Sequence, residues 1–326
     1  MRRTSRASRI TEGRSRGAPR RCLVALALSL SACTQQNGVI GSEPLASAPD
    51  SGSLDAGPTT PTYRTDFDTV DDWGSENDLP GSSTAFGVQV AGAVDPSTAE
   101  LRFPGHPEYA ATDAVGPNGS LTQIESPQRF GFGTYRTRVQ FGNCKSTEET
   151  VNAALGYFRD GSDTNQNGIT DDLEIDFQVL CGTPQNLYLT VFTDYDSDTQ
   201  FRQLSHVIDF STGNSYDTPS AEQSGFTLTS TDPAFLYPGL FAADAFYEVG
   251  FEWHSSSLRF FMMLNGTEQT LWTLSDATHI PQQPVSFLYN LWHPATHWFP
   301  ASAAADFPAN DVVMHVDWFE YYMESP

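Results

Sequence analysis

Residues 174–178, Glu-Ile-Asp-Phe-Gln, alternate two acids and an amide with two apolar side chains. On a β-strand, residues i, i+2 and i+4 face the same side, so the polar side chains should project together while Ile175 and Phe177 pack behind them. The Cα atoms of Glu174 and Gln178 would lie roughly 13 Å apart, and side chains leaning inward could bring their tips to about 5–5.5 Å. Two carboxyl groups at such a separation can perform acid–base and nucleophilic chemistry on a glycosidic bond, but here the last position is an amide.

The elements that must position this segment are predicted to be strands, because their sequences are rich in aromatic and β-branched residues and several alternate in polarity. The predicted strands are Val88–Val90, Tyr135–Phe141, Leu187–Phe192, Val207–Phe210, Tyr247–Trp253, Leu258–Leu264, Val285–Leu291 and Val312–Tyr322. Turn signals such as Asn265-Gly266 separate them, and only Thr147–Ala154 suggests a short helical turn. This pattern predicts an all-β two-sheet sandwich or jelly roll.

The charge is divided unevenly along the chain. Of its 17 Lys+Arg and 40 Asp+Glu, eight arginines and one acid lie in residues 1–21, which leaves nine and 39 for residues 34–326. A surface with this many carboxylates repels the phosphate backbone of nucleic acids. We therefore do not expect a nucleic acid as a partner. A neutral polysaccharide meets no such repulsion.

The N-terminus has the pattern of an export signal. Arginines precede a short apolar run over residues 22–30, and Leu30-Ser31-Ala32-Cys33 resembles the bacterial lipobox. The alternative is an ordinary secretory signal with a chance cysteine. We therefore predict a signal peptide over residues 1–32, a lipidated Cys33 that begins a Ser/Gly/Pro-rich tether over residues 33–62, and a globular domain over residues 63–326. By resemblance to bacterial lipoproteins, Thr34 rather than Asp after the cysteine favours anchoring to the outer membrane, on its periplasmic face or at the cell surface, with the lipid as the only membrane contact.

Five segments together resemble glycoside hydrolase family 16, the lichenase, laminarinase and xyloglucan endotransglycosylase group. The segments are residues 130–139, the catalytic-type strand 174–178, residues 251–254 with the strand 258–266, residues 290–292 followed by Trp298, and residues 316–322. Their order and spacing fit across about residues 63–326. The resemblance implies a concanavalin-like β-jelly-roll sandwich of two antiparallel sheets, with a sugar-binding groove on a concave face.

The resemblance also implies roles for the catalytic-type strand. Glu174 would be the nucleophile of a retaining endo-β-glycanase, and Asp176 would assist it. The acid/base position should hold a glutamate but holds Gln178, and Val179 follows, so a bulged variant of the motif does not restore the acid. A primary amide has no proton to give at neutral pH, and acid–base help is typically worth about 10²–10⁴-fold.

Three functions therefore remain open for a carbohydrate-active protein of this kind. It could hydrolyse O-glycosyl bonds of a β-linked polysaccharide, as an endo-β-glucanase or galactanase, with another group supplying the proton. It could be a catalytically impaired, lectin-like binder of the same glycan. It could be a structural surface module. The resemblance favours the enzyme, and Gln178 puts its activity in doubt.

Aromatic and polar residues near the predicted groove could bind the glycan, because aromatic rings stack on sugar faces. The candidates are Trp253, Tyr289, Asn290, Trp292, His293, His297 and Trp298. Aromatic residues on strands are more often core residues, and a histidine near a strand end is more often merely solvated.

Two further features bear on stability. Asp163, Asn165, Asn167 and Asp171 match the spacing of a calcium loop, although an Asx-rich hairpin loop explains them as well. We predict no required cofactor and leave a structural Ca²⁺ open. In the oxidising compartment that export implies, Cys144 and Cys181 form an even pair. A disulfide between them would add about 3–4 kcal/mol, and the alternative is two buried thiols. We predict a monomer.

Overall fold

The computed structural model describes twelve parts of the chain: residues 60–69, 73–94, 97–105, 120–142, 150–163, 166, 172–180, 186–193, 202–209, 215–219, 245–293 and 308–324. The chain divides into a unit of residues 1–40 and a unit of residues 41–326, and every described residue belongs to the second unit. The predicted signal peptide and Cys33 therefore lie outside the described residues. Within the described ranges, no helix has the length and apolar character needed to cross a membrane.

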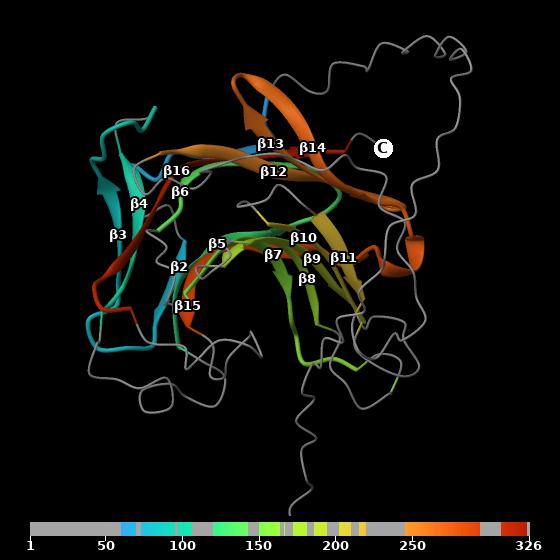
Figure 1. Ribbon diagram of the computed structural model, residues 1–326, viewed down its shortest axis with the longest axis horizontal. Coiled ribbons are helices and arrows are strands. Elements are labelled where there is room, and N and C mark those ends of the chain that lie inside the picture. Colours follow the sequence, from blue (N-terminus) through green and yellow to red (C-terminus); the bar gives the residue numbers. More distant parts are fainter. Residues whose placement is uncertain are drawn as a thin grey trace, which may run out of the picture. The chain divides into compact units, whose positions relative to one another are not determined.

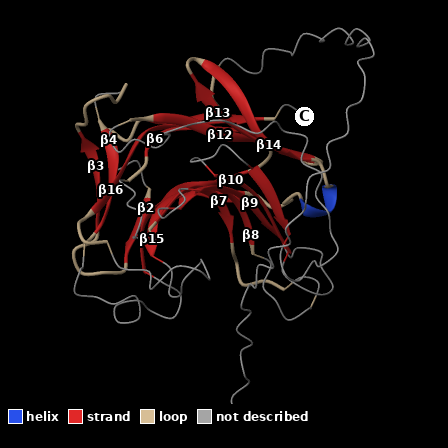
Figure 2. Ribbon diagram, in the orientation of Figure 1, coloured by secondary structure: helices blue, strands red, loops and turns tan. Residues whose placement is uncertain are grey.

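The described residues form two antiparallel β-sheets of eight strands each (Figures 1 and 2). Sheet A contains β1 (Tyr63–Thr65), β3 (Ser83–Val88), β4 (Thr98–Phe103), β6 (Gly133–Gln140), β12 (Tyr247–His254), β13 (Ser257–Leu264), β14 (Thr267–Leu274) and β16 (Val312–Met323). Sheet B contains β2 (Gly74–Asn77), β5 (Ser120–Phe130), β7 (Val151–Phe158), β8 (Leu173–Leu180), β9 (Asn186–Thr193), β10 (Arg202–Asp209), β11 (Ser215–Pro219) and β15 (Val285–His293). A single 3₁₀ turn, η2 (Ala277–His279), is the one helical element within the described ranges. This architecture confirms the predicted all-β jelly-roll sandwich.

The order of strands in sheet B brings distant parts of the sequence together. The order is β11-β10-β9-β8-β7-β15-β5-β2, so β15 lies between β7 and β5 although more than 120 residues separate it from either in the sequence. The catalytic-type strand β8 lies in the middle of the sheet, with β7 and β9 as its neighbours. Crossovers of this kind let one face of sheet B collect side chains from both halves of the domain.

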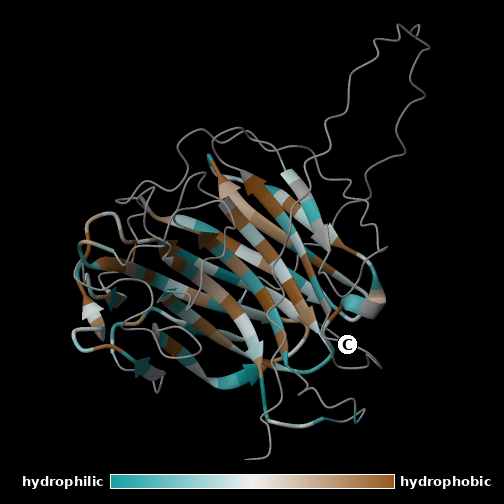
Figure 3. Ribbon diagram, turned by 60° about the horizontal axis from the view of Figure 1, so that its bottom comes forward, coloured by the Kyte–Doolittle hydropathy of each residue, from teal (hydrophilic) through white to brown (hydrophobic). Residues whose placement is uncertain are grey.

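The core between the sheets contains many aromatic side chains. Hydrophobic and hydrophilic residues alternate along many of the strands (Figure 3), and the hydrophobic ones face the core. Phe287 of sheet B stacks on Phe319 of sheet A with ring centroids 4.4 Å apart. Within sheet A, the rings of Tyr135 and Phe251 lie 4.5 Å apart. Such pairs add stabilisation beyond the apolar area that they bury, and the Phe287–Phe319 pair joins the two layers.

Two sequence expectations about local structure were wrong. The expected helical turn at Thr147–Ala154 is a strand from Val151 onward, because β7 lies inside sheet B with nearly every side chain buried, and tertiary packing overrides the helix propensity of its alanines and leucine. The expected strand Val88–Val90 ends at Val88, since β3 occupies Ser83–Val88 and leaves sheet A there. The Asn265-Gly266 turn is confirmed: both residues have positive φ, 51° and 75°, as a two-residue hairpin between β13 and β14 requires.

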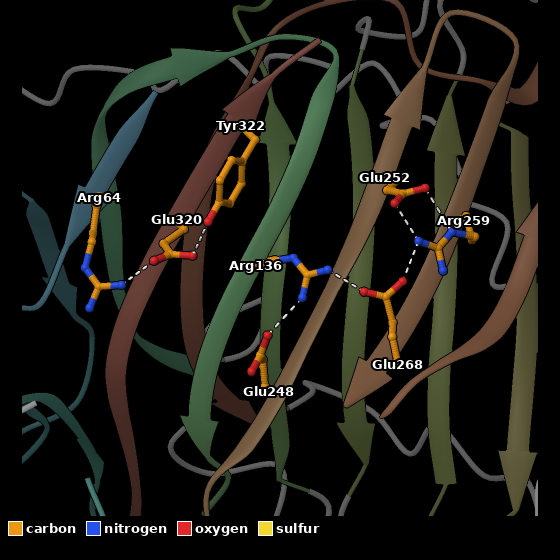
Figure 4. A network of polar contacts seen from close by, with 8 residues as sticks. All are labelled: Arg64, Arg136, Glu248, Glu252, Arg259, Glu268, Glu320 and Tyr322. Atoms are coloured by element: carbon orange, nitrogen blue, oxygen red, sulfur yellow. Dashed lines mark hydrogen bonds and ion pairs between the residues drawn. The ribbon is translucent and has the colours of Figure 1, made fainter. Parts of the chain in front are cut away.

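The face of sheet A that turns away from the core carries a network of ion pairs (Figure 4). Arg136 binds Glu248 and Glu268, and Arg259 binds both Glu268 and Glu252. At the other end of this face, Arg64 pairs with Glu320. The network engages three of the chain's few cations with carboxylates of sheet A, so these charges do not neutralise acids in sheet B.

Candidate active site

The outer face of sheet B carries a groove with a volume of about 690 Å³. Its lining follows the strand register. Glu174 on β8 lies beside Tyr157 on β7, and Gln178 lies beside Ala153 on β7, which in turn lies beside Asn290 on β15. Except for the small Ala153, these residues line the groove. Four adjacent strands, β8, β7, β15 and β5, thus form the groove floor.

The alternation along β8 is as the sequence predicts. Ile175 and Phe177 are buried in the core with sheet A, whereas Glu174 and Gln178 line the groove on the opposite face. Asp176 points to the same face of the strand as Glu174 and Gln178, but its side chain is completely buried. The strand therefore offers one accessible acid to the groove, with a buried acid and a largely buried amide beside it.

The carboxyl of Glu174 is strongly desolvated. Protein atoms surround it on most sides although part of the side chain remains exposed at the groove, and this burial raises the pKa of Glu174 to about 7 from its ordinary value of 4.5. The contact with the Asp176 carboxyl opposes the rise. The negative charge of Asp172 adds to it, and the positive charge of Arg159 reduces it. A carboxyl that titrates near neutral pH can serve as a general acid or base.

Asp176 behaves as the partner that holds a proton. Its complete burial, followed by the charge of Glu174, raises the pKa of Asp176 well above its ordinary value. The contact between the two carboxyls is not a well-aligned hydrogen bond, since neither oxygen of Asp176 has a partner of ordinary geometry within the described part of the chain. Both carboxyls therefore favour the protonated form, and Glu174 is the one of the two that lines the groove.

An apolar cluster forms the middle of the groove floor. Ala153, Leu155 and Leu288 are buried and in mutual contact, with Tyr157 packed against them. Leu155 lies beside Asp176 on one side and beside Leu288 on the other. The acids of β8 therefore border an apolar surface, which explains part of their desolvation and offers a platform for the apolar face of a ligand.

The structure corrects part of the predicted aromatic platform. Trp253 is fully buried between the sheets, where its Nε1 donates to the carbonyl oxygen of Pro281 at 2.9 Å, so it cannot stack on a glycan. Tyr289 is also fully buried, and its hydroxyl lies 2.6 Å from that of Thr137. Both belong to the core because their positions face sheet A. Trp292 alone of these three lines the groove.

The polar candidates on and after β15 differ in whether they reach the groove. Asn290 lines the groove, and its Oδ1 is buried without a hydrogen-bond partner among the described residues. His293 is 0% exposed at the end of β15, so its expected hydrogen bond to a sugar hydroxyl is not available in this conformation. His297 and Trp298 lie outside the described residues.

Several groove residues were missed by sequence analysis. Glu125 and Arg129 come from β5, and Arg159 follows β7. Arg159 pairs with Asp172 at 3.4 Å, and the guanidinium of Arg129 lies over the Phe158 ring at 4.6 Å. The alternation of polar and apolar residues in β5 could have identified the strand, but nothing in the sequence indicates that it joins the face of β8.

The predicted metal and covalent features fall mostly outside the described residues. Of the calcium candidates, Asp163 is described, whereas Asn165, Asn167 and Asp171 are not. No group of three or more His, Cys, Asp or Glu within the described ranges is placed to hold a metal ion. The predicted pair Cys144 and Cys181 is outside as well, so the disulfide stays a prediction.

Comparisons with known proteins give a likeness of fold. No protein-family model and no curated protein matches the chain. Bacillus licheniformis beta-glucanase is 13% identical with a TM-score of 0.48, over 82% of this chain and 100% of that chain. A prokaryotic beta-1,3-1,4-glucanase (lichenase) derived from a mouse hindgut metagenome is 14% identical with a TM-score of 0.47, over 79% and 97%. LamAcat from Zobellia galactanivorans is 14% identical with a TM-score of 0.47, over 81% and 98%. At these identities and TM-scores, the likeness does not establish the family.

Proposed function

We propose that the chain binds a β-linked polysaccharide in the groove of sheet B and hydrolyses its glycosidic bonds. The observation that carries the proposal is Glu174, a carboxyl with a pKa near neutral that faces an open groove. Perturbed carboxyls in clefts are typical of acid–base sites. The five segments that resemble glycoside hydrolase family 16 support the same substrate class.

The remaining lining suits a sugar chain. Trp292 and Tyr157 offer aromatic surface, while Gln123 and Asn290 offer amide groups for hydroxyls. The apolar floor can receive the C–H face of a pyranose ring. The lining comes from several neighbouring strands of sheet B, including β5, β7, β8 and β15.

The retaining route implied by the resemblance meets two obstacles. Gln178 at the acid/base position has no proton to donate. The raised pKa of Glu174 keeps much of it protonated at neutral pH, whereas a nucleophile must be ionised. The second candidate function, glycan binding without turnover, is favoured by this amide and by the burial of Asp176.

The location of the protein in the cell is a separate proposal. We infer from the lipobox-like tetrad that the protein is exported and anchored to the outer membrane through lipid on Cys33. The tether would hold the domain away from the membrane. Membrane fractionation of cells that express the wild type and Cys33→Ala tests this: the variant should leave the membrane fraction, and a variant that stays there contradicts the anchor.

Activity and binding should be measured together on the full chain. Reducing-end release and affinity electrophoresis would use a panel of β-glucans and galactans with the wild type, Glu174→Ala and Gln178→Glu. Hydrolysis of one glycan that Glu174→Ala abolishes supports the enzyme. Binding without hydrolysis, with activity gained by Gln178→Glu, supports the lectin-like alternative. A wild type that neither binds nor cleaves any member of the panel contradicts the proposed function.

A further inference from the structure

Two amide side chains flank one small residue on the groove floor. Gln178 on β8 pairs with Ala153 on β7, and Ala153 pairs with Asn290 on β15. Directly paired residues of an antiparallel sheet point to the same face, and both amides line the groove. The side chain of Ala153 is a single methyl group, so it leaves space between the two amides that a longer side chain would fill. Gln178 and Asn290 are called the amide pair below.

The protein does not hold the amide pair in one orientation. Gln178 is 7% exposed and Asn290 is partly exposed, and no hydrogen bond joins either side chain to another residue in the described part of the chain. By contrast Gln123, the next residue of this row on β5, donates from Nε2 to Glu76 at 3.2 Å. Polar groups that a protein leaves unbonded in a groove indicate that a polar ligand completes their hydrogen bonds.

The spacing of the amide pair fits two neighbouring hydroxyl groups. Two strand spacings of about 4.8 Å put the Cα atoms of Gln178 and Asn290 roughly 10 Å apart, and side chains that stand upright on the sheet keep their amides at about 8–10 Å. One hydroxyl with a hydrogen bond on each side spans only about 5.6 Å, whereas two neighbouring equatorial hydroxyls span about 8.5 Å. A hydroxyl both donates and accepts, so it can bond to either end of an amide.

The surrounding floor suits the rest of the sugar ring. Leu155 and Leu288 contact Ala153 and form an apolar surface on one side of the amide pair. Trp292, two residues beyond Asn290 on β15, lines the groove on the other side. A pyranose ring that places a hydroxyl edge between the amides can therefore pack its C–H groups on apolar and aromatic side chains.

The linkage of a glycan decides whether a neighbouring pair of hydroxyls is present. In a 1,4-linked β-glucan or β-galactan, each internal unit has free hydroxyls on the adjacent carbons C2 and C3. In a 1,3-linked chain, the glycosidic bond occupies the oxygen on C3, so no internal unit has free hydroxyls on two adjacent ring carbons.

We propose that the amide pair binds the C2 and C3 hydroxyls of one sugar unit, so that the groove selects 1,4-linked over 1,3-linked β-glycans. This deepens the proposed function and rests on it. In this role Gln178 contributes to substrate recognition, which requires hydrogen bonds and no proton transfer.

The test is isothermal titration calorimetry with soluble hexasaccharides and the full chain. Every protein carries Glu174→Gln, so that turnover does not consume the ligand. Cellohexaose and a 1,4-linked β-galactohexaose are compared with laminarihexaose, which is 1,3-linked. At least one of the 1,4-linked ligands should bind about 10-fold or more tightly than laminarihexaose. Adding Gln178→Met or Asn290→Leu, which remove an amide at nearly constant shape, should weaken this binding about 3–10-fold and change laminarihexaose binding less than about 2-fold.

Gln140→Met is the matched control. Gln140 on β6 of sheet A has the same residue type and the same 7% exposure as Gln178, but it lies outside the groove lining. This substitution should leave the affinity for all three hexasaccharides unchanged. Thermal unfolding verifies that each variant is folded.

The outcomes separate this inference from the proposed function. Equal affinities for the two linkages, or tighter binding of laminarihexaose, overturn the role of the amide pair and keep the glycan-binding groove. A preference for 1,4-linked ligands that survives both substitutions also overturns it, because another part of the groove then selects the linkage. Failure to bind either 1,4-linked hexasaccharide overturns the inference, and failure to bind every polysaccharide of the β-glucan and galactan panel overturns the proposed function as well.

Discussion

Replacing Glu174 by glutamine should stabilise the fold above neutral pH and leave its stability unchanged near pH 4. Burial raises the pKa of this carboxyl from 4.5 to about 7, so the folded state binds more protons than the unfolded state between these values. Stability therefore falls as pH rises through this window, and the loss is complete above it. One pKa unit corresponds to about 1.4 kcal/mol, so the ionised Glu174 costs about 3 kcal/mol at pH 8. Glutamine has nearly the same shape and carries no charge to desolvate.

The neighbouring Asp176 adds to the stabilisation that we expect for Glu174→Gln. The charge of Glu174 raises the pKa of Asp176, so removing that charge lets Asp176 ionise at a lower cost. The gain at pH 8 should therefore reach at least about 2 kcal/mol even if local relaxation reduces the desolvation.

Urea unfolding of the wild type and Glu174→Gln between pH 4 and pH 9 measures this effect as a shift in the midpoint at constant m-value. Glu324→Gln, with an exposed carboxyl, is the control and should stay within about 0.5 kcal/mol of the wild type at each pH. Equal stabilities of wild type and Glu174→Gln at pH 8 would refute the argument that this carboxyl is desolvated. A variant less stable than wild type at pH 8 would show that the carboxylate is stabilised instead.

Three further predictions concern a close backbone approach, a buried ion pair and the pH dependence of hydrolysis. In Gly250→Ala the added Cβ would lie 2.0 Å from a backbone oxygen of β6, which should cost about 3 kcal/mol or more, whereas Gly131→Ala meets no atom within 4 Å; similar thermal unfolding of the two variants would contradict this. Arg138→Gln removes one ion pair from the fully buried Asp317, which keeps the hydrogen bond from the N–H of Val94, and this should cost about 3 kcal/mol in urea unfolding. Adding Asp317→Asn should recover much of the loss; no recovery would mean that Arg138 acts through its packing. Glycan hydrolysis should change with an apparent pKa near 7 because Glu174 gains or loses its proton there, and a rate that stays constant between pH 5 and pH 9 would exclude Glu174 as an acid–base group.

The sequence predicted about half of the described strands, those in which alternation is strong because one face meets the core. Residues 135–141 and 312–322 fall almost entirely within β6 and β16. Among the strands that it missed, β5 contains Ser, Gln, Glu and Pro residues that weaken the strand signal, although the strand spans Ser120–Phe130. Propensity was also misleading at β7, where burial on both faces of a central strand selects small and aliphatic residues of either type.

The aromatic candidates show the same limit at the site. Trp253 and Trp292 both lie on strands, and the sequence alone makes either one an equally good candidate for stacking on a sugar. Only the sheet assignment and the direction of each side chain put the first between the layers and the second in the groove. Neither property is encoded in the few residues around a tryptophan.

The sequence by itself determined that Glu174 and Gln178 share one face of a strand, because side-chain alternation is a local property of the backbone. It also determined the acidity of the domain and the missing acid at Gln178. The tertiary structure decided which strands lie beside β8, and so brought Glu125 from β5 to the far side of the floor. It also decided the proton affinity of Glu174, because desolvation depends on atoms gathered from β7, β8 and their neighbours after folding.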